Sequence, residues 1–132
     1  MALILVVDDE TEVAEAIRRV LERSGFDVAV AGGVTEGLKV AQTKQPDVVV
    51  TDIIMPKTNG IEFIKALRER HPRVRIVAIS GGGSFGLHAY KPDAIKTHAY
   101  LAAAREAGAQ EILTKPFDMN DLLAAVRRQL PN

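Results

Sequence analysis

Five short apolar runs alternate along the chain with longer segments in which apolar residues recur at helical spacing. The apolar runs predict strands over residues 3–7, 27–31, 48–52, 74–79 and 111–114. The longer segments predict helices over residues 11–24, 35–45, 61–70, 93–107 and 119–130. Strands that alternate with helices are joined by right-handed crossovers and form a parallel sheet covered on both faces. We therefore expect a single α/β domain: a doubly wound, five-stranded parallel sheet in the order 2-1-3-4-5.

The predicted strand over residues 48–52 is the centre of this arrangement. Its three consecutive valines follow Pro46 and are typical of a strand that is buried on both faces of a parallel sheet. Asp52 lies where this strand ends, and residues 57–60 form a predicted turn before the next helix. Open α/β sheets bind their ligands at the carboxyl ends of the strands. Asp52 is therefore the first candidate functional residue.

A few polar and glycine residues mark the predicted helix ends. Thr11 is expected to cap the first helix, and Asp118 the last. Gly25 and Gly108 follow the first and the fourth helix, where glycine commonly ends a helix.

Composition and charge narrow the class of protein. A length of 132 residues suits one domain, and 47% apolar with 26% charged residues is typical of a soluble globular protein. Seventeen basic residues balance seventeen acidic ones, so we expect no direct binding of nucleic acid and no binding to a membrane. The lack of cysteine excludes disulfides and thiol chemistry and, with no secretory signal at the start, fits a cytoplasmic protein.

Polar residues collect at one predicted edge of the sheet. Asp8 and Asp9 follow the first strand, Asp52 ends the third, Ser80 closes the fourth and Lys115 follows the fifth. Strands one and three are neighbours in the predicted order, so three carboxylates meet there and repel one another unless a cation lies among them. A site with oxygen ligands and room for water suits Mg²⁺, which commonly shares its ligand shell with a phosphate.

The same cluster predicts phosphoryl transfer. Asp52 is the expected nucleophile, and its carboxylate would form an aspartyl-phosphate. Ser80 would donate a hydrogen bond to one phosphoryl oxygen, and Lys115 would place a positive charge beside another. Taken alone, Ser80 also fits a simple turn, and Lys115 fits a surface charge.

Five motifs together resemble the receiver domain of bacterial two-component response regulators. They are Asp8-Asp9, the stretch from Asp52 to Pro56, Gly60 eight residues beyond Asp52, Ser80-Gly81, and Lys115-Pro116-Phe117. The resemblance covers nearly the whole chain and implies a flavodoxin-like receiver fold over residues 1–132.

This resemblance implies a phosphoryl acceptor and a metal site. Asp52 would accept a phosphoryl group from the phosphohistidine of a sensor histidine kinase or of a histidine phosphotransfer protein. Asp9, Asp52 and the backbone carbonyl of Ile54 would ligate Mg²⁺, and Asp8 would reach the ion through water.

Further roles follow from the same resemblance. Ser80 and Lys115 would hold the phosphoryl oxygens, and the Lys115-Pro116 peptide bond would be cis. Gly81 and Gly82 would lie in the loop beside the phosphoryl group, and Ile54 and Gly82 would border the path of an attacking water. A downstream protein would read the phosphorylation state on the face formed by the fourth helix, the fifth strand and the fifth helix.

Two features depart from the family pattern. Ile112 stands where the family usually has an aromatic switch residue, and an isoleucine has no polar tip. The loop over residues 81–92 is longer than the family norm, and a long glycine-rich loop beside a phosphate site is commonly functional. Phe85 or Tyr90 in this loop would then take over the aromatic role, or the loop would form a partner-specific surface.

Three other functions remain open at this point. Residues 81–86 match the glycine pattern of dinucleotide-binding proteins, although they follow the fourth strand and no helix opens at the last glycine. Haloacid dehalogenase-type phosphatases also use an aspartate and Mg²⁺, but there the two acids after the first strand alternate. A receiver-like interaction module without phosphorylation is the third alternative, and acetyl phosphate with Mg²⁺ distinguishes these classes.

The predicted organisation is a single-domain response regulator. It either acts alone, by binding partners or passing the group along a relay, or is the receiver part of a larger protein. Met1 directly before the first strand and Pro131 directly after the last helix favour the former. We expect the chain to catalyse only its own phosphorylation and dephosphorylation, and not to act as an enzyme on outside substrates.

Overall fold

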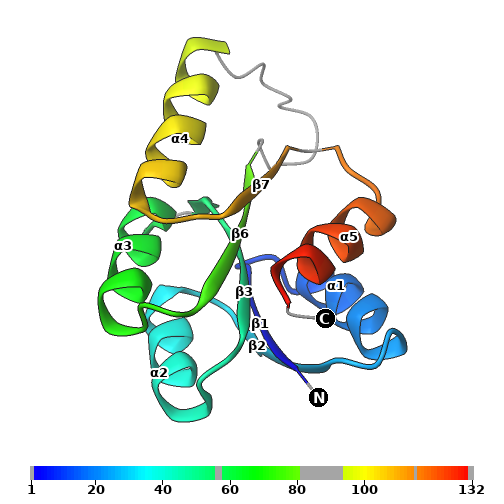
Figure 1. Ribbon diagram of the computed structural model, residues 1–132. Helices are drawn as coiled ribbons and strands as arrows, with labels where there is room; N and C mark the ends of the chain where they lie inside the picture. Colours follow the sequence, from blue (N-terminus) through cyan, green and yellow to red (C-terminus); the bar gives the residue numbers. More distant parts are fainter. Residues whose placement is uncertain (1, 56–57, 81–93, 115, 131–132) are drawn as a thin grey trace.

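A computed structural model describes residues 2–55, 58–80, 94–114 and 116–130 of the chain. Its main sheet consists of five parallel strands, in the order β2-β1-β3-β6-β7 (Figure 1). These strands are β1 (Leu3–Val7), β2 (Asp27–Ala31), β3 (Val48–Asp52), β6 (Arg75–Ser80) and β7 (Glu111–Thr114). Along the chain, β6 and β7 are the fourth and fifth strands of this sheet. The predicted parallel sheet and its strand order 2-1-3-4-5 are therefore confirmed.

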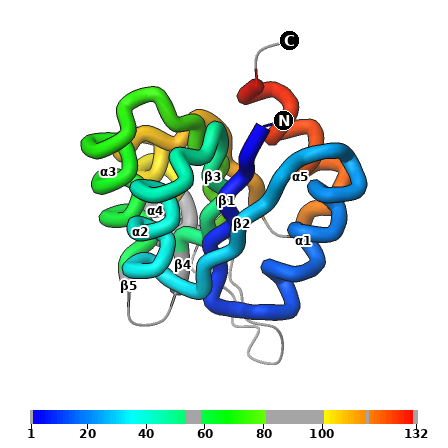
Figure 2. The backbone as a smooth tube through the Cα atoms, turned by 90° about the horizontal axis from the view of Figure 1, so that it is seen from below, coloured from blue at the N-terminus to red at the C-terminus, as the bar shows by residue number. Residues whose placement is uncertain are grey.

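Helices cover both faces of this sheet (Figures 1 and 2). On one face lie α1 (Thr11–Arg23) and α5 (Met119–Gln129). On the other face lie α2 (Val34–Lys44), α3 (Gly60–Arg70) and α4 (Ala94–Ala107). Within the described ranges, no helix combines the length and the apolar character needed to cross a membrane.

Each face of the sheet has its own hydrophobic core. On the side of α1 and α5, Ile4 belongs to a buried cluster with Ile17 and Leu122. On the opposite side, Leu5 belongs to a buried cluster with Phe63. Consecutive residues of β1 therefore contribute to different cores, because side chains along a strand point alternately to its two faces.

The last helix and two glycine stops agree with the sequence signals. Asp118 caps α5, and the backbone N–H of Asp121 donates to Asp118 Oδ1 at 2.9 Å. Gly25 after α1 has φ of 95°, and Gly108 after α4 has φ of 128°. Both angles lie in the region that glycine adopts without steric cost, so a glycine at each position ends its helix.

The start of the first helix differs from the prediction. Thr11 is the first helical residue, and the N-cap position is taken by Glu10, whose side chain makes no capping hydrogen bond. The expectation that Thr11 caps this helix is therefore wrong. Asp8 explains the shift, because its Oδ1 accepts from the backbone N–H of Glu10 at 2.9 Å and thereby sets where the helix begins.

Arg68 of α3 ties three segments together at the amino edge of the sheet, opposite Asp52. Its Nη1 donates to the carbonyl oxygens of Pro72 at 2.8 Å and Val74 at 2.7 Å. Its Nη2 donates to the carbonyl oxygen of Gly108 at 2.8 Å and to Oε1 of Gln110 at 3.1 Å. One guanidinium group thus holds α3, the loop before β6 and the loop before β7 in place.

Replacing Arg68 by Met is expected to lower the free energy of unfolding by about 2 kcal/mol. Met keeps much of the apolar stem but leaves several acceptors without their donor. Urea denaturation measures the change, with Arg23→Met on the exposed end of α1 as the matched control. Equal unfolding midpoints for the two variants would contradict the role assigned to Arg68.

Candidate functional site

Two buried aspartates lie at the carboxyl edge of the sheet, at the ends of neighbouring strands. Asp8 directly follows β1 and is 2% exposed, and Asp52 is the last residue of β3 and is 4% exposed. The pairing of Val7 with Thr51 places the two strand ends side by side. The chain leaves β1 and β3 toward opposite faces of the sheet, which makes this edge the switch point of the fold.

Glu10 completes an acidic group with these aspartates. One carboxylate oxygen from each of Asp8, Glu10 and Asp52 lies within 4.8 Å of the other two. The turn from Asp8 into α1 directs Glu10 back toward the sheet edge, where it is half-buried. The sequence prediction named Asp8 and Asp9 as site residues and missed Glu10. The available signal was that Glu10 directly follows the two aspartates.

Asp9 lies outside this acidic group. Its side chain is exposed, unlike those of Asp8 and Asp52. Its role as a direct metal ligand stays a prediction.

The acidic group fits a small divalent cation. Three carboxylates at this spacing repel one another in a largely buried setting, and a cation among them offsets that repulsion. Two oxygens that each lie about 2.1 Å from Mg²⁺ are at most about 4.2 Å apart, so the observed spacing needs only small side-chain adjustments. Asp8, Glu10 and Asp52 could therefore hold Mg²⁺ through all-oxygen ligation.

The residues next to Asp52 fix its position. Thr51 is fully buried, and its Oγ1 donates to the backbone carbonyl oxygen of Asp52 at 3.0 Å. Ser80, the last residue of β6, is 1% exposed and lies on the strand adjacent to β3. The structure thus places Ser80 at the same edge as Asp52, one strand away.

The segment after Asp52 turns back on itself before α3. Its two short strands, β4 (Ile54–Met55) and β5 (Thr58–Asn59), pair antiparallel, with Ile54 opposite Asn59. The predicted turn over residues 57–60 is wrong for residues 58–60, because Thr58 and Asn59 are paired and Gly60 begins α3. The pairing provides hydrogen-bond partners for backbone N–H and C=O groups that a simple turn would leave unpaired. It also fixes the backbone at Ile54.

Gly60 closes this segment against Ile53, the residue after Asp52. Its backbone N–H donates to the carbonyl oxygen of Ile53 at 3.1 Å. Asn59 caps α3, because its Oδ1 accepts from the backbone N–H of Ile61 at 2.9 Å. A Cβ atom at residue 60 would lie 2.4 Å from the Ile53 carbonyl oxygen, so only glycine fits this close approach.

Several predicted site residues lie outside the described part of the chain. They are Lys115, Gly81, Gly82, Phe85 and Tyr90, together with the Lys115-Pro116 peptide bond and the long loop after β6. Their assigned roles stay predictions. Ile112, at the position of the family's aromatic switch residue, is half-buried and packs against the core on the side of α2, α3 and α4.

Mg²⁺ is expected to raise the melting temperature of the protein. At about ten times its Kd, a bound ligand adds about 1.4 kcal/mol, which corresponds to a rise of about 5 °C. Replacing Glu10 by Gln removes one carboxylate from the acidic group and should reduce the rise. Glu12→Gln, on the exposed first turn of α1, is the matched control and should keep it. Scanning calorimetry measures the rise in melting temperature. An equal rise in both variants would show that Glu10 does not help to bind the ion.

Comparisons with known proteins find similarity over nearly the whole chain. The family model of the response regulator receiver domain matches residues 4–127. The alkaline phosphatase synthesis transcriptional regulatory protein PhoP of Bacillus subtilis is 36% identical over 124 residues, which are 94% of this chain and 46% of PhoP. The photosynthetic apparatus regulatory protein RegA of Rhodobacter capsulatus is 33% identical over 123 residues, which are 93% of this chain and 60% of RegA. The chain thus spans about half the length of these relatives.

Solved structures show the same architecture at closer to equal length. The chemotaxis protein CheY4 of Vibrio cholerae has 28% identity and a TM-score of 0.81, with 98% of this chain and 99% of CheY4 covered. A response regulator receiver domain protein from Clostridium thermocellum has 31% identity and a TM-score of 0.80, with 98% and 94% covered.

Proposed function

Because this chain belongs to the response regulator receiver family, we propose that Asp52 accepts a phosphoryl group in two-component signalling. The donor would be the phosphohistidine of a sensor histidine kinase or of a histidine phosphotransfer protein. The observation that carries the proposal is the close group of Asp8, Glu10 and Asp52 carboxylates at the switch point of the sheet. Such a group unites a nucleophile with ligands for a divalent cation.

The proposed step is a displacement at phosphorus. A carboxylate oxygen of Asp52 forms a bond to phosphorus as the bond from phosphorus to the donor's histidine nitrogen breaks, and that nitrogen keeps the electron pair. The hydrogen bond from Thr51 to the backbone carbonyl oxygen of Asp52 helps to fix the main chain that carries this carboxylate. Water later attacks the same phosphorus, which releases inorganic phosphate and restores the carboxylate.

Neighbouring side chains would stabilise the negative charge of the phosphoryl oxygens. Asp8 and Glu10 would hold Mg²⁺, which neutralises charge on the phosphoryl oxygens when it is bound. The hydroxyl of Ser80, one strand away from Asp52, would donate to a phosphoryl oxygen. Lys115, which follows β7 in the sequence, would place its ammonium group beside another.

We infer that phosphorylation changes the binding of a downstream protein on the face formed by α4, β7 and α5. Ile112 lies in β7 and packs against the core. Because Ile112 has no hydroxyl group, the coupling in this chain would act through apolar packing. Its reaction would be confined to its own phosphorylation and dephosphorylation.

Acetyl phosphate with Mg²⁺ tests the proposal directly. A receiver gains one acid-labile phosphoryl group, which intact-protein mass spectrometry detects, and loses it again on standing. A phosphatase would instead release phosphate continuously, and an interaction module without phosphorylation would do neither. A chelator of divalent cations should prevent the gain.

A further inference from the structure

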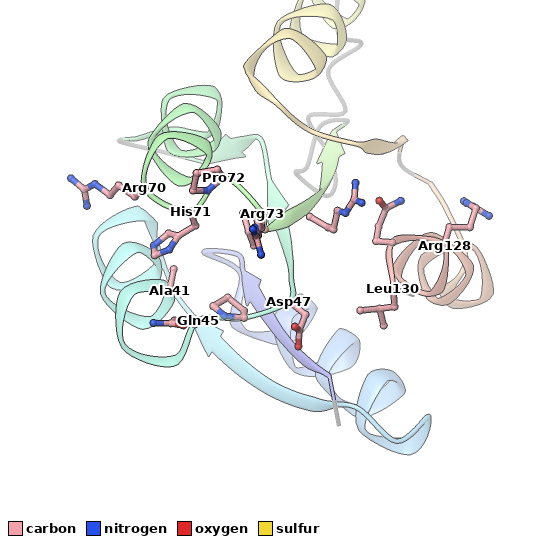
Figure 3. Close-up of a pocket in the computed structure, with 13 residues that line it drawn as sticks. Ala41, Gln45, Asp47, Arg70, His71, Pro72, Arg73, Arg128 and Leu130 are labelled. Atoms are coloured by element: carbon pink, nitrogen blue, oxygen red, sulfur yellow. The ribbon is translucent and has the colours of Figure 1, made fainter. Parts of the chain in front are cut away.

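A cleft of about 740 Å³ lies at the amino edge of the sheet, at the opposite end of the strands from Asp52 (Figure 3). It is bounded by the end of α2, by the loop between α3 and β6, and by the end of α5. Figure 3 shows Arg73 and Asp47 near its middle, with Arg70 and Arg128 on opposite sides. The proposed phosphorylation chemistry uses none of these residues.

Positive charge is concentrated at this cleft. Arg70, Arg73 and Arg75 all line it, are all exposed, and come from a stretch of six residues. None of the three forms an ion pair with any residue in the described ranges. Among the described residues that line the cleft, Asp47 is the single one with a carboxylate, and its Oδ2 already accepts from the backbone N–H of Leu3 at 2.9 Å. Although the net charge of the whole chain is zero, the cleft therefore carries a local excess of positive charge.

Neighbouring groups do not relieve this imbalance. Behind the cleft, burial and the nearby charge of Arg75 both lower the pKa of Arg68, with burial the larger cause. The hydrogen bonds of Arg68 go to uncharged carbonyl and amide oxygens. On the far side, the guanidinium of Arg128 is already paired with Glu111 at 2.6 Å. An added anion would thus find several cations that have no anionic partner within the described part of the chain.

The cleft also offers some apolar surface at its edge. Ala41, Pro46 and Val74 line it and are buried, and Leu130 is half-buried at its edge. Gln45, another lining residue, ends α2 in a left-handed conformation with φ of 49°, and its backbone N–H donates to the carbonyl oxygen of Ala41.

We propose that this cleft binds a small phosphorylated organic anion. Its phosphate groups would lie against Arg70, Arg73 and Arg75, because the planar guanidinium matches phosphate with paired hydrogen bonds. Its apolar body would lie against Leu130. The volume favours a small molecule over an acidic protein segment, since clefts of about 300–1,000 Å³ are typical of small-molecule sites.

An NMR titration of the full chain tests this site separately from the phosphorylation site. The probes are ATP, inorganic tripolyphosphate and a hexaglutamate peptide, each added without Mg²⁺ and with a chelator present. ATP should shift amide signals of residues 45–47, 70–75 and 128–130. Shifts confined to residues 8–10 and 52 would place binding at the acidic group and overturn the proposal.

Charge removal gives the decisive comparison. Combining Arg70→Gln, Arg73→Gln and Arg75→Gln should weaken ATP binding about tenfold. Arg19→Gln, Arg23→Gln and Lys39→Gln remove the same charge from exposed positions elsewhere and should change the Kd less than twofold. Dispersed amide spectra establish that both variants are folded, and equal weakening in the two would overturn the proposal.

The choice of probe identifies the ligand class. Tighter binding of ATP than of tripolyphosphate supports a site for phosphate joined to an apolar body, and equal binding overturns the part assigned to Leu130. Hexaglutamate binding as tight as that of ATP would assign the cleft to an acidic protein segment instead. Rising salt should weaken ATP binding, because the arginines are exposed and their charges are screened.

Discussion

Replacing Asp52 by Asn is expected to abolish the uptake of a phosphoryl group from acetyl phosphate and Mg²⁺. The amide is uncharged and a poor nucleophile, and it also removes one carboxylate from the group that would hold the ion. We expect the rate to fall by more than about a thousandfold, the scale seen when a nucleophile is removed from a preformed site. A time course by intact-protein mass spectrometry measures the fraction phosphorylated.

Asp27→Asn is the matched control for this experiment. Asp27 is exposed at the start of β2, at the edge of the sheet away from the acidic group, so the substitution should leave phosphoryl uptake unchanged. The melting temperatures of both variants establish that each is folded. Phosphoryl uptake by Asp52→Asn at the parental rate would show that another residue is the acceptor.

Replacing Gly60 by Ala is expected to lower the stability of the fold strongly. The new Cβ would lie 2.4 Å from the carbonyl oxygen and 2.5 Å from the Cα of Ile53, and backbone atoms cannot yield as a flexible side chain can. Either α3 or the chain after Asp52 must shift, at a cost of about 3 kcal/mol. Urea denaturation measures the free energy of unfolding, and a reduced rate of phosphoryl uptake is expected in the same variant.

Gly33→Ala provides the comparison. A Cβ at Gly33 meets no atom within 4 Å, so only the small difference between glycine and alanine at a helix N-cap remains, about 0.5 kcal/mol. Losses of similar size in the two variants would show that the contact with Ile53 is not what requires glycine at residue 60.

The architecture could be predicted because each strand carries its own signal in sequence. The valine run of β3 and the apolar run of β1 are long enough to indicate burial on both faces, and helical periodicity fills the intervals between strands. The predicted bounds of β2 and β7 agree with the structure. Parallel strands joined by helices leave few possible topologies, so the strand order followed.

The features that the sequence did not reveal depend on short or distant contacts. The pairing of β4 with β5 involves two residues on each strand, too few to produce a periodic pattern. Glu10 joins the acidic group because the turn at Asp8 directs it there, which is a matter of geometry and not of residue type. The basic cleft brings together residues 45–47, 70–75 and 128–130, and no local window of sequence contains them all.

Consecutive residues of β1 and β3 contribute to different hydrophobic cores. If either layer of helices separated from the sheet, apolar side chains of both strands would therefore be exposed to water. The amides of β1 and β3 should then exchange with deuterium only when the whole domain opens. The acidic group stands at the ends of these two strands. The distances between its carboxylates would therefore persist while other parts of the fold open locally.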